Sequence, residues 1–409
     1  MADNHDLLIL PNQGDSSIVL SDGRSSLFAR GRKELSNLLN RREVLYLARV
    51  KVNGRYGFID RTGQYVIDPV FEGAGDFSEN IAYVVVKHMY GFIDNAGTII
   101  IEPQFEEVTS FSEGLASVEV DTSEINKIGF IDKTGNFVIS PQFRWSSYHT
   151  YQFKDGLAGV DVGNKKWGYI DKSGELVIKA KFDSTEDFSD GTARVSFGEH
   201  DCFGYIDTTG KFIINRLFDQ SQDFSEGFAA VRLNGKWGYI DKMEEFVIAP
   251  QFVCSWDFHE GIAVAALHEG EGWGYIDKSG EYFISPRFKD ADYFHEGMAR
   301  VEIGNKYGFI EKTGKYVIDP IFDNARPFCE GLARVNIGGN GIYGGKYGFI
   351  NRIGDIVIKV QYDDAESFED GLARVKIGDK WGYIDKTGEF VIPPKFNHVG
   401  SFHKTELST

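Results

Sequence analysis

The sequence repeats one phrase ten times between residues 46 and 402. The phrase starts with aromatic-Gly-aromatic-Ile-Asp, continues through Lys-Thr-Gly and an apolar trio, and ends with two spaced aromatic residues. Its glycine recurs in steps of 34, 38, 39, 36, 34, 36, 34, 40 and 34 residues, at Gly57, Gly91, Gly129, Gly168, Gly204, Gly238, Gly274, Gly308, Gly348 and Gly382. Such a period is typical of repeat proteins, in which each unit buries its apolar face against the next. The sequence therefore predicts one array of ten units.

The composition is that of a folded, acidic protein. Hydrophobic residues make up 42% of the chain and aromatic residues 14%, which is far from the composition of disordered chains. The net charge of −17 repels nucleic-acid phosphate and anionic lipid, so no nucleic-acid partner is expected. The same charge favours cationic partners, although solubility alone also accounts for it.

Each unit is expected to form a three-stranded antiparallel meander. In the copy that starts at Lys236, the first strand is the segment 237–241 and the apolar trio 246–248 belongs to the second. The Asp-Lys-Thr-Gly phrase between such strands fits a type I turn followed by a left-handed glycine, with the aspartate accepting hydrogen bonds from the turn amides. A proline follows the trio in seven copies and is expected to end the second strand, because it has no amide to donate.

A third strand with strict apolar and polar alternation follows a Ser/Glu-Gly turn, as in residues 372–377. Its second position is alanine in all ten copies, which predicts the close approach of a neighbouring sheet or ring. Such a strand at 47–52 precedes the first hairpin, so each unit runs in the order third, first and second strand. We expect the first two strands to be covered on both faces by adjacent units, since one unit cannot bury a core alone.

The segment KWGYIDKTGEFVIPPKF, at residues 380–396, closely resembles the WG-repeat (KWG-repeat) family of bacterial proteins. The turn, proline and ring positions recur together over residues 46–402. The resemblance implies an all-β repeat fold and a role in interactions. It implies no reaction and offers no catalytic residues to transfer to this sequence.

Two architectures fit ten such units. The units could stack as an open, solenoid-like superhelical array, or they could close as a β-propeller in which the N-terminal strand completes the last blade. Propellers typically have about four to eight blades of four strands, whereas this chain offers ten units of three. We therefore expect the open array and keep the propeller as the alternative.

Residues 1–45 do not repeat and are expected to form a cap of short strands and one amphipathic helix at 25–44. The basic face of this helix consists of Arg30, Arg32, Lys33, Arg41 and Arg42. The helix either caps the first unit against the acidic array or docks on an acidic partner or membrane surface. The array is expected to cover residues 46–402, and residues 403–409 to form a C-terminal tail.

Function is expected where the copies differ, because the recurring residues are structural. Three insertions stand out, at residues 121–127, 144–152 and 338–346, and insertions in repeat proteins map to loops that often lie on the binding face. The candidate binding residues in the last two insertions are Trp145, Tyr148, His149, Tyr151 and Tyr343. Such rings suit stacking on a sugar or a peptide. A longer loop whose rings pack locally is the alternative.

The third position of the third strand is the other candidate site. Arg300, Arg334 and Arg374 hold this position in the last three copies of the strand and could clamp carboxylates or phosphates. A solvated strand face with salt bridges is the alternative interpretation.

Signals for metal or catalytic chemistry are weak. His259 and His295 share a position in neighbouring units and would share a metal if they stacked, but an exposed loop explains them as well. The sequence has no nucleophile elbow, Walker loop, dinucleotide fingerprint or Cys-x-x-Cys pair, and its three cysteines fall at unmatched positions. We predict no cofactor, no metal and no catalytic residues.

The leading functional hypothesis is a non-catalytic protein-interaction scaffold. A glycan or cell-envelope binding module is the first alternative, and an enzyme with a site on the repeat loops is the second. No apolar run of about 18 residues predicts a membrane span, and the N-terminal residues lack the basic region of a secretory signal. A cytoplasmic protein is expected, and export by another route stays open.

Overall fold

The computed structural model describes residues 44–121, 126–146, 151–198, 202–214, 217–243, 245–340 and 343–406. The chain is all-β over these residues, and the described part has no helix that could cross a bilayer. The N-terminal segment with its predicted helix at 25–44 lies outside the described residues and stays a prediction.

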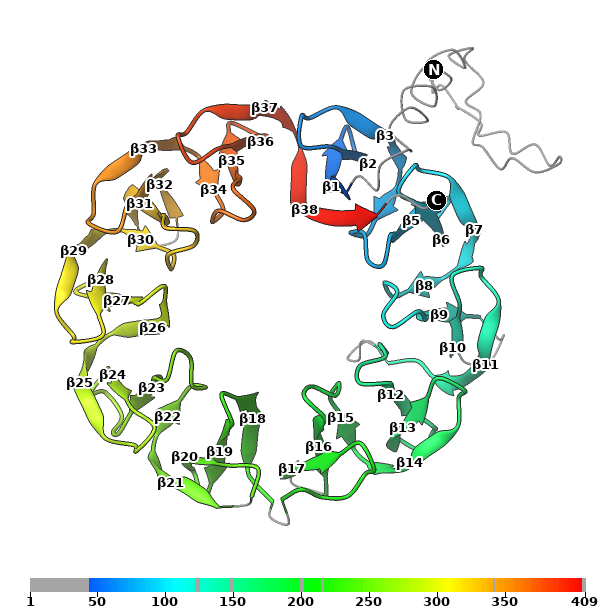
Figure 1. Cartoon of the computed structure of the whole chain (residues 1–409), viewed down its shortest axis with the longest axis horizontal. Coiled ribbons are helices and arrows are strands. Elements are labelled where there is room, and N and C mark those ends of the chain that lie inside the picture. Colours follow the sequence, from blue (N-terminus) through cyan, green and yellow to red (C-terminus); the bar gives the residue numbers. More distant parts are fainter. Residues whose placement is uncertain are drawn as a thin grey trace. The chain divides into compact units, whose positions relative to one another are not determined.

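The chain divides into two compact units, each of which contains several repeat units. The first comprises Met1–Phe153, Lys172–Gly174 and Asn397–Thr409, and the second comprises Lys154–Asp171 and Glu175–Phe396. Each compact unit is a succession of small antiparallel sheets whose strands follow one another along the chain (Figure 1).

The first unit contains β1 (Val44–Val52), β2 (Arg55–Ile59), β3 (Tyr65–Phe71), β4 (Gly73–Ala74), β5 (Ile81–Val86), β6 (Met89–Asp94), β7 (Ile99–Phe105), β8 (Glu107–Val108), β9 (Ala116–Val120), β10 (Lys127–Ile131), β11 (Phe137–Arg144) and β38 (His398–Glu406). Hydrogen bonds join them in the orders β3-β2-β1-β38, β4-β5-β6-β7 and β8-β9-β10-β11.

The second unit contains β12 (Leu157–Asp161), β13 (Trp167–Asp171), β14 (Leu176–Phe182), β15 (Ser184–Thr185), β16 (Thr192–Phe197), β17 (Cys202–Asp207), β18 (Gln220–Ser225), β19 (Phe228–Leu233), β20 (Lys236–Ile240), β21 (Phe246–Phe252), β22 (Cys254–Ser255), β23 (Ala263–Ala266), β24 (Trp273–Ile276), β25 (Tyr282–Phe288), β26 (Asp290–His295), β27 (Met298–Ile303), β28 (Lys306–Glu311), β29 (Tyr316–Phe322), β30 (Asn324–Ala325), β31 (Ala333–Asn340), β32 (Tyr343–Ile350), β33 (Ile356–Tyr362), β34 (Asp364–Ala365), β35 (Ala373–Ile377), β36 (Lys380–Ile384) and β37 (Phe390–Phe396). They pair in chain order as β12–β14, β15–β17, β18–β21, β22–β25, β26–β29, β30–β33 and β34–β37.

Most sheets contain four strands, where three were predicted. The predicted order of third, first and second strand is confirmed, for example as β5-β6-β7, and the additional strand β4 pairs with β5. Six of the additional strands, β4, β8, β15, β22, β30 and β34, span two residues each. Two residues are too few to show an alternation of apolar and polar positions, so the sequence pattern did not reveal them.

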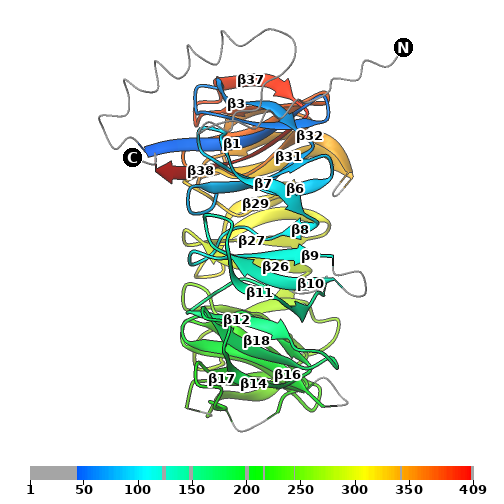
Figure 2. The same cartoon turned by 90° about the vertical axis from the view of Figure 1, so that its right-hand side faces the viewer.

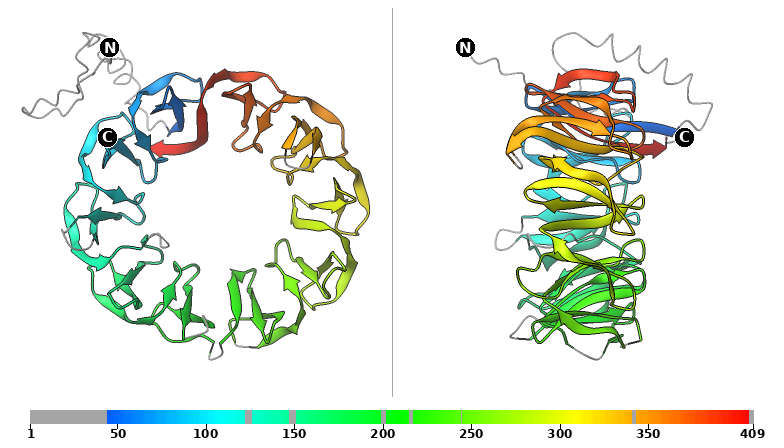
Figure 3. Two further views of the ribbon diagram at one scale, coloured as in Figure 1. Left: turned by 180° about the vertical axis from the view of Figure 1, so that it is seen from behind. Right: turned by 90° about the vertical axis from the view of Figure 1, so that its left-hand side faces the viewer.

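The last strand of the chain completes the first sheet. β38 pairs with β1 from Val44↔Glu406 to Lys51↔His398, and the amide of Asn397 donates to the carbonyl oxygen of Lys51 at 2.8 Å. Figures 2 and 3 show the two strands side by side. An open array predicts a free edge at each end; here the first and last strands of the array pair instead. β38 also continues to Glu406, into the predicted tail.

The glycine of the repeated phrase lets the second strand pass directly over the first. Tyr56 pairs with Phe71 and Phe58 with Ile67, so residues 68–70 bulge over Gly57. A Cβ atom on Gly57 would lie 2.5 Å from the Ile67 oxygen and 2.6 Å from the Pro69 nitrogen. The same backbone contact recurs at Gly91, Gly129, Gly168, Gly238, Gly274, Gly308, Gly348 and Gly382. The prediction that proline ends the second strand is therefore wrong. Pro69 lies within the strand, in the bulge, where no ladder hydrogen bond requires the amide that proline lacks.

The hydrophobic core lies between successive sheets. In the first compact unit, Phe58, Ile67 and Phe71 of one sheet pack against Ala74, Phe77, Ala82, Val84 and Ile93 of the next. Equivalent positions form the other core clusters. Ala82 is 1% exposed, which confirms that the recurring alanine marks the approach of a neighbouring sheet. Each fully buried phenylalanine contributes roughly 2–3 kcal/mol, and this contribution depends on the sheet next to it.

The second strand is covered on one face only. In β37, Val391, Pro393 and Lys395 are exposed, whereas Ile392 is 1% exposed. Burial on both faces holds for the first strand, where Phe58 and Ile59 are fully buried. It is wrong for the second strand, whose other face is exposed.

The turns form as predicted, and further polar contacts join neighbouring sheets. Asp60 accepts hydrogen bonds through Oδ1 from the Thr62 amide at 2.8 Å and from the Thr62 hydroxyl at 2.6 Å. Between sheets, the Ser78 hydroxyl donates to the Phe111 carbonyl oxygen at 2.8 Å. The Glu79 carboxylate accepts from the Gly114 amide at 3.1 Å and pairs with Lys133 at 3.0 Å. Most of these contacts reach the backbone of the next unit.

Replacing Gly238 with alanine is expected to lower the free energy of unfolding by at least about 2 kcal/mol, because the new Cβ atom would lie 2.5 Å from the Ile248 oxygen. Gly227→Ala is the matched control, since this glycine has a φ of 87° and nothing within 4 Å of the added atom. Its expected cost is about 1 kcal/mol. Urea denaturation followed by circular dichroism measures both, and equal losses would contradict the close-contact explanation.

Truncation after Phe396, which removes β38, is expected to lower the thermal midpoint by roughly 5–10 °C. The cause is the loss of the ladder to β1 and of Val399 and Phe402, which are 3% and 8% exposed. A chain truncated after Glu406 keeps the whole of β38 and should melt like the intact protein. Calorimetry would count against the pairing if both truncations behaved alike.

Candidate functional site

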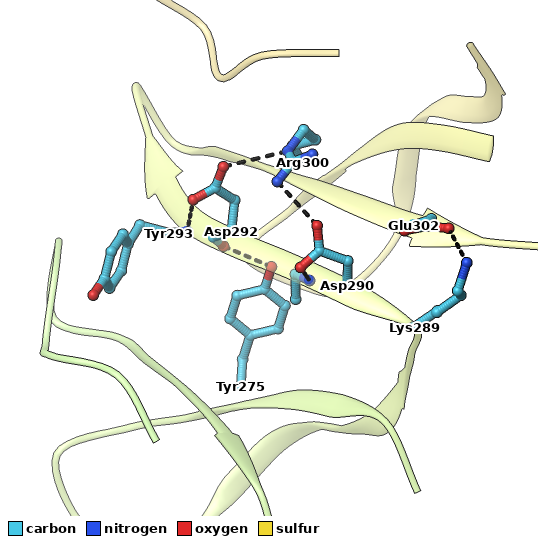
Figure 4. Close-up of polar contacts among 8 residues, drawn as sticks. Tyr275, Lys289, Asp290, Asp292, Tyr293, Arg300 and Glu302 are labelled. Atoms are coloured by element: carbon cyan, nitrogen blue, oxygen red, sulfur yellow. Dashed lines mark hydrogen bonds and ion pairs between the residues drawn. The ribbon is translucent and has the colours of Figure 1, made fainter. Parts of the chain in front are cut away.

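Arg300, a predicted binding residue, is held by its own unit. Its Nε lies 3.3 Å from Asp292 Oδ2 and its Nη2 lies 3.1 Å from Asp290 Oδ2 (Figure 4). The guanidinium also lies over the Tyr307 ring at 4.7 Å, and the side chain is 15% exposed. Two carboxylates therefore neutralise the charge that was predicted to bind a ligand.

The other third-position arginines also contact their own chain. Arg334 is buried, lies over Tyr347 at 4.8 Å and donates to the carbonyl oxygen of Ala365 in the next sheet. Burial lowers the pKa of Arg334 from its ordinary value. Arg374 also has interaction partners within the described residues. The ligand-binding role of these arginines stays a prediction, while their observed contacts join strands and sheets.

Variation at the third position is matched by the residue facing it on the additional strand. Arg194 faces Glu186, with a salt bridge at 3.3 Å. Ser117 faces Thr109, and their hydroxyls lie 3.0 Å apart. Tyr83 faces Gly75, where a Cβ atom would lie 2.2 Å from the tyrosine ring. In these three copies the facing residue therefore matches the third position in charge, hydrogen bonding or size.

The aromatic insertion does not display all its rings. Tyr151 is 2% exposed, and its hydroxyl donates to the Arg144 carbonyl oxygen at 3.0 Å. Trp145 is half-buried, while Tyr148 and His149 lie outside the described residues. In the described part, this agrees better with local packing than with an exposed stacking surface.

The insertion at 338–346 lengthens a hairpin where a flexible loop was predicted. β31 extends to Asn340 and β32 starts at Tyr343, and the backbones of these two residues pair. The added residues therefore continue the ladder beyond the sheet.

His259 and His295 lie close together, with ring centroids 4.9 Å apart and the ring planes tilted by 45°. Nδ1 of His259 lies 2.9 Å from the Phe294 carbonyl oxygen, which matches the contacts of Ser78 and Ser225 at the same position in other units. No group of three or more histidine, cysteine or acidic residues within the described ranges is placed to hold a metal ion. His259 therefore makes the contact that joins neighbouring sheets at this position.

A groove of about 520 Å³ lies beside Trp273 in the second compact unit. Val253, Ala266, Trp273 and Phe288 give it an apolar floor, and the hairpin loop 268–272 forms one wall. Sequence reasoning missed this site. The step of 36 residues between Gly238 and Gly274 shows that this hairpin has two residues more than its predecessor, but the same step separates Gly168 from Gly204.

The rim of the groove carries both signs of charge. Glu269 and Glu271 are exposed on the loop, and no ion pair links either to a described residue. Arg287 is engaged with the Gly314 carbonyl oxygen at 2.7 Å. Lys289 contacts Glu302 and Asn305, each at 2.6 Å. The uncompensated charge of the rim is therefore negative.

An aromatic cluster adjoins the groove. Trp256 is 41% exposed and contacts Trp273 and Tyr293, with ring centroids 6.1 and 5.7 Å apart. His259 continues the cluster at 5.6 Å from Tyr293. Trp256 holds the position that Glu186 and Asp292 hold in their units, and Val264 holds the arginine position. Trp256 and Val264 therefore stand where three other repeat units have an acid and an arginine.

Asp257 is an unusual carboxyl beside this cluster. Burial, together with the like charge of Asp223, raises the pKa of Asp257 to about 6, and Arg194 partly opposes the shift. The buried Oδ1 atom has no hydrogen-bond partner among the described residues. The ionised form of Asp257 is therefore disfavoured in the folded state.

The WG containing repeat family matches ten consecutive segments of the sequence, at residues 56–87, 90–121, 128–165, 167–199, 203–237, 237–267, 273–307, 307–340, 347–381 and 381–404. The chain belongs to this family. The predicted family is thereby confirmed over most of the repeat array. No curated protein matches this WG-repeat chain.

Solved structures give the WG-repeat chain a likeness of fold. The crystal structure of the eukaryotic initiation factor is 11% identical with a TM-score of 0.50, and the likeness covers 78% of this chain and 97% of that one. A protein of unknown function from Bacteroides caccae is 15% identical, with a TM-score of 0.24 and coverage of 50% and 93%. Apo AztD from Citrobacter koseri is 11% identical, with a TM-score of 0.33 and coverage of 90% and 98%. The first likeness is one of fold alone and says nothing of function.

Asp257→Asn is expected to stabilise the protein at pH 7 by roughly 1–2 kcal/mol, after discounting for partial solvent exposure. The folded-state pKa of Asp257, about 6, exceeds the ordinary value of 3.8. The ionised carboxylate therefore destabilises the folded state above pH 6. This cost fades between pH 6 and pH 4, and the gain from asparagine should fade with it.

Asp207→Ala is the control of opposite sign. The Thr209 hydroxyl lowers the pKa of Asp207, so its stabilising effect is present at pH 7 and is lost as the pH falls through the folded-state pKa. Thermal melts of both variants from pH 4 to pH 8 give the comparison. A pH-independent effect of Asp257→Asn would refute the assignment.

Proposed function

We propose that this WG-repeat protein is a non-catalytic interaction scaffold whose docking site includes the groove beside Trp273. The observation that carries the proposal is the departure of one unit from the others. In this repeat unit the hairpin is two residues longer than in the preceding one, and Trp256 and Val264 replace the acid–arginine pair of three other repeat units. Departure at several neighbouring positions is what a binding surface on a repeated framework requires.

The groove suits a segment of a partner protein. It is an open groove of about 520 Å³, which leaves room for a side chain of a partner. A half-buried tryptophan on an apolar floor with a polar rim is the usual composition of an interface centre. The negative rim and the net charge of −17 favour a cationic partner. We place this partner in the cytoplasm, with export as the alternative.

A glycan or cell-envelope polysaccharide is the second candidate ligand. The observation in its favour is the exposed ring of Trp256, 41% exposed and next to Tyr293 and His259. Aromatic faces of this kind stack on sugar rings. Retention on immobilised polysaccharide, lost in Trp256→Ala, would favour this candidate over a protein partner.

A loop exchange tests the scaffold proposal. Residues 267–272 are replaced by the shorter LNGK of residues 233–236, which removes the groove wall and keeps a loop that the fold already uses. A partner captured by the intact chain from its native cell is expected to be lost, with at least about a tenfold fall in recovery.

The control for the loop exchange shortens the β31–β32 hairpin by removing residues 339–344, a change at a different loop. Quantitative mass spectrometry of the captured proteins compares the three chains. A partner that is retained equally by all of them would place docking elsewhere and refute the role of the groove.

A further inference from the structure

The units differ in what covers the aromatic ring that begins the first strand. In the first repeat unit, the Lys51 ammonium lies 4.8 Å from the centroid of the Tyr56 ring. In the last repeat unit, the Lys376 ammonium lies 5.9 Å from the centroid of the Trp381 ring. The residue facing Trp273 at this position of the third strand is Ala266, which lines the groove. The lysine that covers the ring in those two repeat units is absent here.

An ion pair that adjoins the ring position in four other repeat units is also missing. In four other units, the residue just before the ring is basic and bridges to an acid after the second strand, as Lys166 does with Asp183 at 2.5 Å. The equivalent pairs are Arg55–Glu72, Lys306–Asp323 and Lys346–Asp363. Here Gly272 takes the basic position and Lys289 the acidic one. Trp273 therefore borders an open groove where other units place their own lysine or arginine.

The charges around the groove are not neutralised in the same way as elsewhere. Lys289 is turned to Glu302 and Asn305, and Arg287 to Gly314, so these cations are already engaged. Glu269 and Glu271 on the opposite wall have no ion-pair partner among the described residues. An aromatic ring without its covering cation thus lies next to two uncompensated carboxylates.

We propose that the groove receives an arginine side chain of the partner protein, with its guanidinium over Trp273 and paired with Glu269 and Glu271. The partner then supplies the cation that Ala266 and Gly272 fail to supply. A guanidinium fits better than an ammonium, because it is planar, stacks on aromatic faces and binds carboxylates through two parallel hydrogen bonds. This inference rests on the proposed function and names the chemistry that the groove recognises.

Fluorine NMR of the full chain labelled with 5-fluorotryptophan tests the inference. The protein has six tryptophans, and Trp273→Phe identifies the resonance of Trp273. The probe is N-acetyl-L-arginine methylamide, and the uncharged citrulline and the lysine analogues are the comparisons. We expect a saturable shift of the Trp273 resonance with arginine, a dissociation constant at least about threefold weaker with lysine, and no shift with citrulline.

Variants separate the roles of ring and carboxylates. Ala266→Lys restores the cation that two other units carry and is expected to abolish the shift, whereas the matched change Lys376→Ala at Trp381 should leave the arginine affinity unchanged. Glu269→Gln with Glu271→Gln alters exposed side chains only and is expected to weaken binding by about five- to tenfold at low salt. Thermal melts check that each variant is folded.

Three results would overturn the inference: equal shifts with citrulline and arginine, equal affinity for lysine and arginine, or an unchanged affinity in the folded glutamine variant. Failure here can be told apart from failure of the scaffold proposal. If the loop exchange abolishes partner capture while the arginine probe shifts nothing, the scaffold stands and its ligand is not arginine. If arginine binds but capture survives the loop exchange, the groove binds the cation without docking the partner.

Discussion

The packing of one sheet against the next is the interaction on which the remainder of this structure depends. Phe58, Ile67 and Phe71 are buried because the following sheet presents alanine and valine to them, and that sheet in turn needs its own successor. The core clusters of the described residues combine side chains from successive sheets. The pairing of β38 with β1 extends this dependence to the first sheet, which receives a strand from the far end of the sequence.

The repeated phrase follows from this packing and from one close backbone contact. The glycine that precedes Phe58 is required because the bulged second strand leaves no room for a Cβ atom. The aspartate closes the turn, and the aromatic residues fill the space between sheets. These residues are occupied in building the array, so a ligand has to be sought where a unit departs from the phrase. The unit of Trp273 departs at Val253, Val264, Ala266 and Gly272.

Much of the fold could be predicted from the sequence, because the repeat reports each structural constraint ten times. Strand order, turn chemistry and the meaning of the recurring alanine followed from alternation and position. The two-residue strands and the bulge at Pro69 did not, because neither has a periodic signature and both depend on backbone contacts across the sheet. The pairing of β1 with β38 depends on residues more than three hundred positions apart, which no local pattern encodes.

The candidate site was harder to predict than the fold. Aromatic residues in insertions suggested a surface around Trp145 and Tyr151, but Tyr151 packs inward and donates to a backbone oxygen. The arginines were predicted to bind a ligand, yet the charge of Arg300 is met by Asp290 and Asp292, which only spatial proximity reveals. The groove beside Trp273 arises from what its unit lacks. Missing residues become visible only when the spatial neighbours in other units are known.

The polar contacts between sheets are directed mainly at backbone atoms. Ser78 donates to a carbonyl oxygen of the following unit and Glu79 accepts from a glycine amide, so neither depends on the identity of the side chain that it meets. A unit can therefore acquire new surface residues without requiring a matching change in its neighbour. An array joined in this way is modular: duplication, loss or exchange of a unit preserves the joints, and a new binding specificity can evolve in one copy while the others keep the protein folded.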